Sequence, residues 1–156
     1  MSHGSCVLGI RCYPDKVAAV SLSGTQGNPT LERLEIKTFP VDRSPAGQLA
    51  WVFEELDELL RDAKPGAASY KKVEGMAVKN KSTLQRAEVE GVVKAALSKN
   101  GLEPRGFIKS QLKSETNYGG DTKNVAEVLS TTAIRDLLGT DAEEAALVAF
   151  ATLKAT

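Results

Sequence analysis

The chain has 156 residues, of which 42% are hydrophobic, and equal numbers of acidic and basic residues. A chain of this length can bury the core of one ordinary domain without disulfides or metals. No stretch approaches the roughly 18 consecutive apolar residues of a membrane span, and the N-terminus lacks the basic and then apolar order of a secretory signal. The sequence therefore predicts one cytoplasmic domain over residues 6–156, after a disordered or tag-like start at residues 1–5, with no membrane partner.

Basic residues are concentrated in the middle of the chain. Residues 64–113 contain eleven lysines and arginines against four acidic residues, whereas residues 1–63 contain six against nine and residues 114–156 contain three against seven. This asymmetry has two explanations, which are solvated helix and strand edges or a basic surface beside an acidic pocket.

Three strands are predicted at the start of the chain. Residues 6–13 and 17–23 are apolar, β-rich runs separated by a turn-forming Pro-Asp-Lys sequence, which favours an antiparallel hairpin. The segment 31–39 follows, and its later part alternates apolar and polar residues with the period of a half-exposed strand.

Helices and strands alternate through the rest of the predicted chain. The expected elements are a helix from Ser44-Pro45 to Pro65-Gly66, a strand over 72–78, a helix capped by Ser82 that ends at Asn100-Gly101, a short strand at 107–108, a loop over 110–121, and helices over 125–138 and 140–153. The order β-β-β-α-β-α-β-α-α predicts an α/β fold, with a mixed five-stranded sheet and helices on both faces.

Three acidic residues are candidate ligands for divalent cations. Glu74 interrupts a strand-like run, and Asp141 and Glu144 are three residues apart at an expected helix start, which would place their side chains on one face. Each also has a structural explanation. Thr140 to Glu143 match a capping box, first-turn acids favour the helix dipole, and Glu74 could be a carboxylate at a sheet edge or in a salt bridge.

Three stretches of the chain resemble, in order and spacing, the RuvC-type Holliday-junction resolvases, which belong to the ribonuclease-H-like superfamily. They are Val7-Leu8-Gly9-Ile10 leading into a hairpin, Val73-Glu74 followed by Lys79-Asn80 and Glu90-Gly91-Val92, and the acid-then-alanine-rich run from Asp141 to Ala149. The resemblance covers nearly the whole chain, and it implies a ribonuclease-H-like fold for residues 6–156.

The resemblance also implies chemistry. Proteins of this family use four carboxylates to bind two Mg²⁺ or Mn²⁺ ions, which activate water and stabilise the leaving oxygen. Glu74, Asp141 and Glu144 match three of these carboxylates as catalytic and metal-binding residues. A homodimer is implied as well. The candidate nucleic-acid-binding residues are the cations Lys79, Lys81, Arg86, Lys109 and Lys113 of the basic middle segment.

Arg11 stands where the family has its first-strand aspartate. A positive charge about 4 Å from a bound cation costs on the order of 4 kcal/mol per unit charge at an effective dielectric near 20. Arg11 could instead pair with the three carboxylates through its forked donors and take the place of the metal, or it could turn to solvent.

Three functions therefore remain open from the sequence. The first is a catalytically degenerate RuvC-like protein that binds branched or duplex nucleic acid, or a protein partner. The second is an active Mg²⁺-dependent endodeoxyribonuclease of DNA recombination with an altered site. The third is an α/β interaction protein with no nucleic-acid role.

Overall fold

The computed structural model describes residues 6–73, 80–108, 111–112, 135–137 and 139–154. The strands are β1 (Val7–Cys12), β2 (Lys16–Thr25), β3 (Asn28–Thr38), β4 (Ala67–Lys71) and β5 (Arg105–Phe107). The helices are α1 (Pro45–Ala63), α2 (Lys81–Lys99) and α5 (Glu143–Thr152), with a 3-10 turn η1 at Arg135–Leu137. None of these helices is long and apolar enough to cross a membrane.

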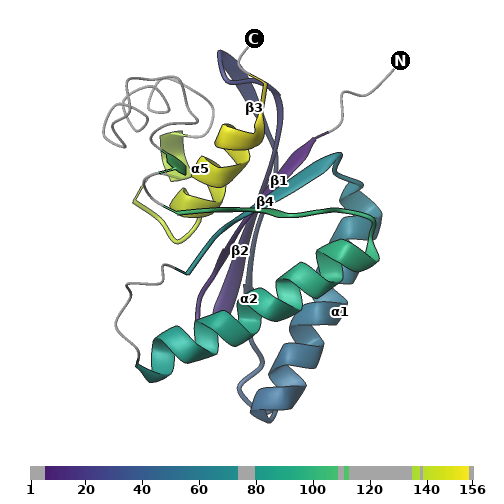
Figure 1. The fold of residues 1–156 in the computed structure, drawn as a ribbon, viewed down its shortest axis with the longest axis vertical. Coiled ribbons are helices and arrows are strands. Elements are labelled where there is room, and N and C mark those ends of the chain that lie inside the picture. The colour runs from purple at the N-terminus through teal and green to yellow at the C-terminus, as the bar shows by residue number, and fades with distance from the viewer. Residues whose placement is uncertain (1–5, 74–79, 109–110, 113–134, 138, 155–156) are drawn as a thin grey trace.

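The five strands form one mixed sheet in the order β3-β2-β1-β4-β5. β2 pairs with β1 and β3 in the antiparallel sense, and β4 pairs with β1 and β5 in the parallel sense. Helices α1 and α2 lie together on one side of this sheet, and α5 lies on the other side (Figure 1). The predicted α/β fold, with a mixed five-stranded sheet and helices on both faces, is confirmed.

β1 divides the hydrophobic core into two layers because its side chains alternate between the faces of the sheet. Leu8, Ile10 and Cys12 belong to the core cluster under α1 and α2. Val7 belongs to the cluster under α5. Arg11 is on the same side as Val7, so β1 presents the Arg11 side chain towards α5 at the carboxyl end of the strand.

Gly9 allows α5 to lie directly against β1. A β-carbon added at Gly9 would collide with the carbonyl oxygen of Ala145 and would lie 2.6 Å from the backbone nitrogen of Ala149. The alanine-rich sequence of α5 permits the same close approach from the other side, since Ala145, Ala146 and Ala149 are all buried against the sheet. This contact fixes the position of the α5 N-terminus relative to Arg11.

The strand predicted over residues 72–78 is absent at residues 72 and 73, the described part of that range. A strand, β4, lies earlier and begins directly after α1, where the amide of Gly66 donates to the carbonyl of Cys6 at 2.9 Å. Ala67 then pairs with Val7. Small residues in β4 hid this strand from the hydrophobicity pattern, although its position between β1 and β5 buries it. Residues 74–79 lie outside the described residues.

The predicted cap of the following helix was also wrong. Asn80 caps α2 and accepts from the amide of Thr83 at 2.9 Å, so that Ser82 lies inside the first turn. Ser44 caps α1 as predicted, and its side chain accepts from the amide of Gly47 at 3.1 Å.

Replacing Asn80, which caps α2, should therefore lower the stability of the protein more than replacing Ser82, the predicted cap. Asn80→Ala is expected to lower the free energy of unfolding by about 1 kcal/mol, because it leaves the Thr83 amide without its acceptor. Ser82→Ala removes no cap and should change stability by less than about half of that amount. Urea unfolding of the two variants measures the difference, and an equal loss in both would contradict the assignment of the cap.

The last helix begins later than predicted. α5 starts at Glu143, and no side chain caps it at Ala142. The hydroxyl of Thr140 donates to the carbonyl of Leu137 at 2.6 Å and accepts from the amide of Ala142 at 3.2 Å. The Glu143 amide donates to the Thr140 backbone carbonyl instead, so the predicted capping box does not form. Asp141 therefore precedes the helix, and the expectation that Asp141 and Glu144 share a helical face was wrong. The predicted loop over 110–121 and helix over 125–138 fall almost entirely outside the described residues.

Candidate functional site

The candidate site lies where the carboxyl ends of β1 and β4 meet the start of α5. Because Ile10 pairs with Tyr70, Arg11 and Lys71 follow side by side on neighbouring strands. Both cations face Glu144 in the first turn of α5: Arg11 Nε lies 3.5 Å from Glu144 Oε2, and Lys71 Nζ lies 3.9 Å from the same oxygen. One carboxylate is thus shared by two positive side chains.

A second ion pair lies beside the first. Lys16, at the start of β2, places its Nζ 2.7 Å from Asp141 Oδ2. Both pairs are next to the Tyr13 ring, since the Arg11 guanidinium is 4.8 Å and Lys16 Nζ is 5.2 Å from its centroid. Tyr13 also donates its hydroxyl proton to the backbone carbonyl of Asp141 at 2.8 Å. The β1–β2 turn and the chain before α5 are therefore joined through this cluster.

The Arg11–Glu144 pair is close in distance but poorly aligned. Arg11 Nε and Nη1 and Glu144 Oε2 are buried atoms that have no hydrogen-bond partner in the described structure. Hydrogen bonds weaken steeply when donor and acceptor are misaligned. A buried charged group that lacks a hydrogen bond lowers the stability of the protein. The pair is thus held by charge attraction without the bidentate geometry that an arginine can form with an anion.

The described side chains of this cluster do not fit a site for two divalent metal ions. Arg11, Lys71 and Lys16 contribute three positive charges, and Asp141 and Glu144 contribute two negative charges. The nearest partners of both carboxylates are cations of the same chain. Among the described residues, no group of three or more potential metal ligands converges.

The structure brings together part of the predicted site. Arg11 and Glu144 are in contact, and Asp141 forms its own ion pair with Lys16, with its backbone carbonyl bound by the Tyr13 hydroxyl. Glu74, Lys79, Lys109 and Lys113 lie outside the described residues.

The two remaining predicted nucleic-acid-binding residues differ in their surroundings. Lys81 is exposed at the first position of α2. Arg86 is partly buried, and its Nη2 donates to the carbonyl of Lys71 at 3.4 Å while its Nε is buried without a partner. Arg86 therefore lies at the end of β4, next to the candidate site.

Lys71, Lys16 and Tyr13 belong to the cluster but were not predicted from the sequence. Lys71 was missed because the strand was predicted to begin at residue 72, which left Lys71 outside it. Tyr13 could have been found, since it is two residues after Arg11 and lies in the hairpin that follows the same strand.

A buried carboxylate supports the segment that follows β4. Glu90 of α2 is buried, and its Oε2 accepts from the backbone amide of Val73 at 3.0 Å. Burial is the main cause that raises the pKa of Glu90 above its ordinary value, although the Val73 amide and the cations Lys94 and Lys72 act in the opposite direction. The neighbouring Cys12 thiol is buried as well, which raises its pKa to about 12.

Glu90 should give the protein a measurable pH dependence of stability. A carboxyl group whose pKa is raised by folding binds its proton more tightly in the folded state, so the folded protein loses stability as pH rises from the unfolded pKa through the folded one. Glu90→Gln keeps an oxygen that can accept from Val73 and does not ionise. The stability of the variant relative to wild type is therefore expected to increase between about pH 4 and pH 7. Chemical unfolding across this range measures it, and a constant difference would contradict the direction of the shift.

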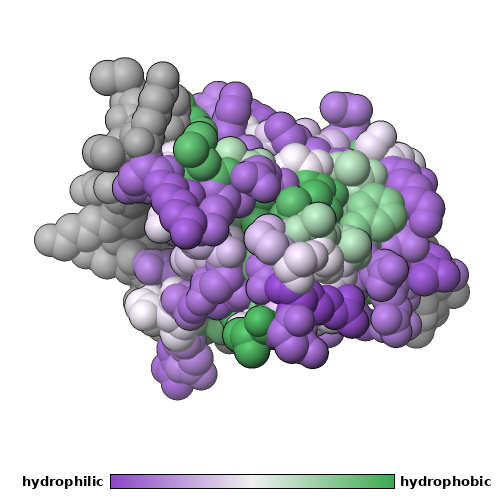
Figure 2. Space-filling model, turned by 90° about the horizontal axis from the view of Figure 1, so that it is seen from below, coloured by the Kyte–Doolittle hydropathy of each residue, from purple (hydrophilic) through white to green (hydrophobic). Residues whose placement is uncertain are grey.

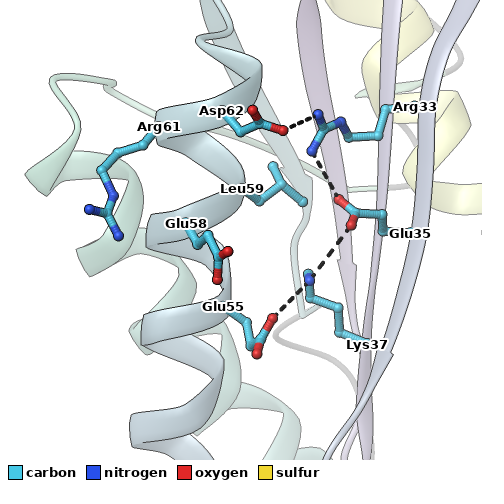
Figure 3. Close-up of a pocket in the computed structure, with 8 residues that line it drawn as sticks. All are labelled: Arg33, Glu35, Lys37, Glu55, Glu58, Leu59, Arg61 and Asp62. Atoms are coloured by element: carbon cyan, nitrogen blue, oxygen red, sulfur yellow. Dashed lines mark hydrogen bonds and ion pairs between the residues drawn. The ribbon is translucent and has the colours of Figure 1, made fainter.

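A charged groove of about 660 Å³ lies elsewhere, between the edge strand β3 and α1 (Figure 3). Arg33 pairs with Asp62 and Glu35, and Lys37 pairs with Glu35 and Glu55. Charged side chains that point inward along an edge strand discourage pairing with other sheets. The groove therefore has a structural explanation, and its paired charges do not indicate a ligand.

The chain was compared with protein families, curated sequences and solved structures, and only the solved structures match it. No family model and no curated protein sequence matches the chain. Among solved structures, the fold is that of the Holliday-junction resolvases. The RuvC of Thermus thermophilus in complex with a Holliday junction substrate is 16% identical, with a TM-score of 0.71 over 95% of this chain and 90% of that one.

Two further structures agree with this fold. A second Thermus thermophilus RuvC structure is also 16% identical, with a TM-score of 0.72 over 94% of this chain and 90% of that one. The yeast mitochondrial Holliday junction resolvase Ydc2 is 12% identical, with a TM-score of 0.66 over 95% of this chain and 77% of that one. The predicted RuvC-like, ribonuclease-H-like fold is confirmed.

Proposed function

We propose that this protein is a catalytically degenerate member of the RuvC-type nuclease family that binds branched or duplex DNA without cleaving it. One observation carries the proposal: Arg11, at the family's first-carboxylate position, lies 3.5 Å from Glu144 at the start of the last helix. A tethered guanidinium supplies positive charge where the resemblance implies a metal ion. Two-metal catalysis needs carboxylates that are free to coordinate both ions.

Electrostatics favours the internal cations over a bound metal. Lys71 adds a second positive charge at Glu144, and Lys16 holds Asp141. A divalent cation that entered here would lie close to Arg11, at a cost on the order of 4 kcal/mol per unit of its charge for a 4 Å separation. The same positive charges attract the phosphates of DNA.

The basic middle segment supplies a surface for DNA. Its exposed lysines include Lys72 beyond β4, and Lys81 and Lys94 along α2. Figure 2 shows one face of the molecule, on which hydrophilic residues surround a central area of hydrophobic and intermediate residues. Exposed lysines suit the wet and polar contacts that phosphates require. The Holliday junction in the complex of the Thermus thermophilus RuvC supports branched DNA as the ligand.

We also propose that the protein acts as a homodimer through α2. Ala87, Gly91 and Ala95 form one stripe of this helix, and all three are exposed, so the stripe is not part of the core of this chain. Small residues at four-residue spacing allow two helices to approach closely.

Binding and cleavage of a labelled four-way junction test the proposed function. The protein is expected to bind the junction and a matched duplex in EDTA, with an affinity that falls steeply as salt increases, because phosphate contacts release counterions. No cleavage is expected with Mg²⁺ or Mn²⁺. Metal-dependent cleavage would establish an active endonuclease instead, and the absence of binding at low salt would favour a protein partner.

A further inference from the structure

We propose that Arg11 and Lys71 form a binding site for a phosphodiester group, and that Glu144 occupies this site when no nucleic acid is bound. The inference rests on the proposed nucleic-acid binding and adds to it a specific contact that needs no metal. It also assigns Glu144 a role opposite to that of a metal ligand. The acid competes with the ligand instead of helping to hold it.

The charges that meet at Glu144 favour an anion over a cation as ligand. Arg11 and Lys71 both place positively charged nitrogens beside this carboxylate, at 3.5 and 3.9 Å from the same oxygen. A phosphodiester carries one negative charge and would be attracted to both cations, whereas a divalent cation would be repelled by both.

The geometry of the Arg11–Glu144 pair points to the same ligand. Arg11 Nε and Nη1 are two buried donors without hydrogen-bond partners, although a carboxylate oxygen lies 3.5 Å from Nε. A phosphate group can accept two parallel hydrogen bonds from one guanidinium, and such bidentate pairs are stronger than misaligned ones. Phosphate can therefore satisfy donors that Glu144 leaves unsatisfied.

The residues around Arg11 leave its side chain little room to move when a ligand binds. The Tyr13 ring packs against the guanidinium, and the Arg11 side chain is only 14% exposed. The Glu144 side chain is less enclosed, because it is 38% exposed at the start of a helix. Replacement of Glu144 by phosphate thus requires rotation of one partly exposed side chain and leaves Arg11 in place.

The inference predicts that Glu144→Gln and Arg11→Gln change the affinity for the junction in opposite directions, measured in EDTA so that no divalent metal is bound. Glu144→Gln removes the competitor and is expected to tighten junction binding by about fivefold, the effect of one unit charge at 4 Å in water. Arg11→Gln is expected to weaken binding by at least about tenfold, the loss of one charged hydrogen bond. It should also reduce the slope of log affinity against log salt by about 0.9, the loss of one phosphate contact.

Matched controls separate these effects from net charge and from folding. Glu143→Gln makes the same charge change one residue away in α5, and Arg61→Gln makes it on the exposed surface of α1. Circular dichroism and thermal unfolding establish that each variant is folded. If Glu144→Gln binds like Glu143→Gln, and Arg11→Gln binds like Arg61→Gln, the inference is overturned while the proposed DNA binding stands.

Inorganic phosphate distinguishes the two proposals if wild type binds no nucleic acid. At constant ionic strength, phosphate in place of chloride is expected to raise the midpoint of thermal unfolding of Glu144→Gln more than that of Glu143→Gln. That result would support the anion site while the proposed DNA binding fails. Equal shifts in the two variants would overturn the anion site as well.

Discussion

An Arg11→Asp variant is expected to bind Mg²⁺ roughly 30- to 1,000-fold more tightly than wild type, which corresponds to about 2–4 kcal/mol after discounting for solvent. The substitution changes the net charge of the described cluster from plus one to minus one. It also removes the guanidinium that lies against Glu144 and places a carboxylate beside it. Lys71 remains next to Glu144, so the variant should still bind Mg²⁺ more weakly than an all-carboxylate site would.

Isothermal titration calorimetry with Mg²⁺ measures this gain directly. Arg61→Asp is the control, because it makes the same charge change at an exposed position on α1. Tight Mg²⁺ binding by wild type, or an equal gain in both variants, would show that Arg11 does not exclude the metal. The proposal of a degenerate nuclease would then lose its main support.

Gly9→Ala is expected to be among the most destabilising single substitutions in the chain, with a loss of about 3 kcal/mol or more. The added methyl group would overlap the backbone of α5 at Ala145 and Ala149, and backbone atoms of a packed helix cannot move aside as a flexible side chain can. Separation of α5 from β1 would also carry Glu144 away from Arg11.

Gly91→Ala is the matched control for this prediction. A β-carbon at Gly91 meets nothing within 4 Å, and Gly91 lies in the middle of α2. Alanine has a higher helix propensity than glycine, so this variant should gain about 0.5–1 kcal/mol at protein concentrations where the chain is monomeric. Urea unfolding of both variants measures the contrast. A loss of less than about 1 kcal/mol for Gly9→Ala would mean that α5 does not pack on β1 as described.

The sequence by itself determined the strands and helices that are marked by residues close together in the chain. Alternation and turn residues predicted the β1–β2 hairpin, and Ser44-Pro45 predicted the start of α1. These signals are readable because they depend on neighbours within a few residues.

The position of β4 was decided only by the tertiary structure. Three of its five residues are Ala or Ser, and the segment becomes a strand through pairing with β1, so a hydrophobic pattern could not locate it. The start of α5 was decided by a competing local contact instead. The Thr140 hydroxyl donates to the carbonyl of Leu137 and accepts from the amide of Ala142, so it does not cap the helix at Glu143.

The partners of Arg11 also depended on the tertiary structure. The sequence showed a positive residue at the first-carboxylate position, with two acids about 130 residues later. It did not show that Lys71 would share Glu144 or that Lys16 would take Asp141, because these contacts join three strands and the start of a helix. Charge pairing acts through space over a few ångströms, whereas sequence spacing reports only neighbours along the chain. The packing of α5 on the sheet therefore decided which of the described charges meet at the site.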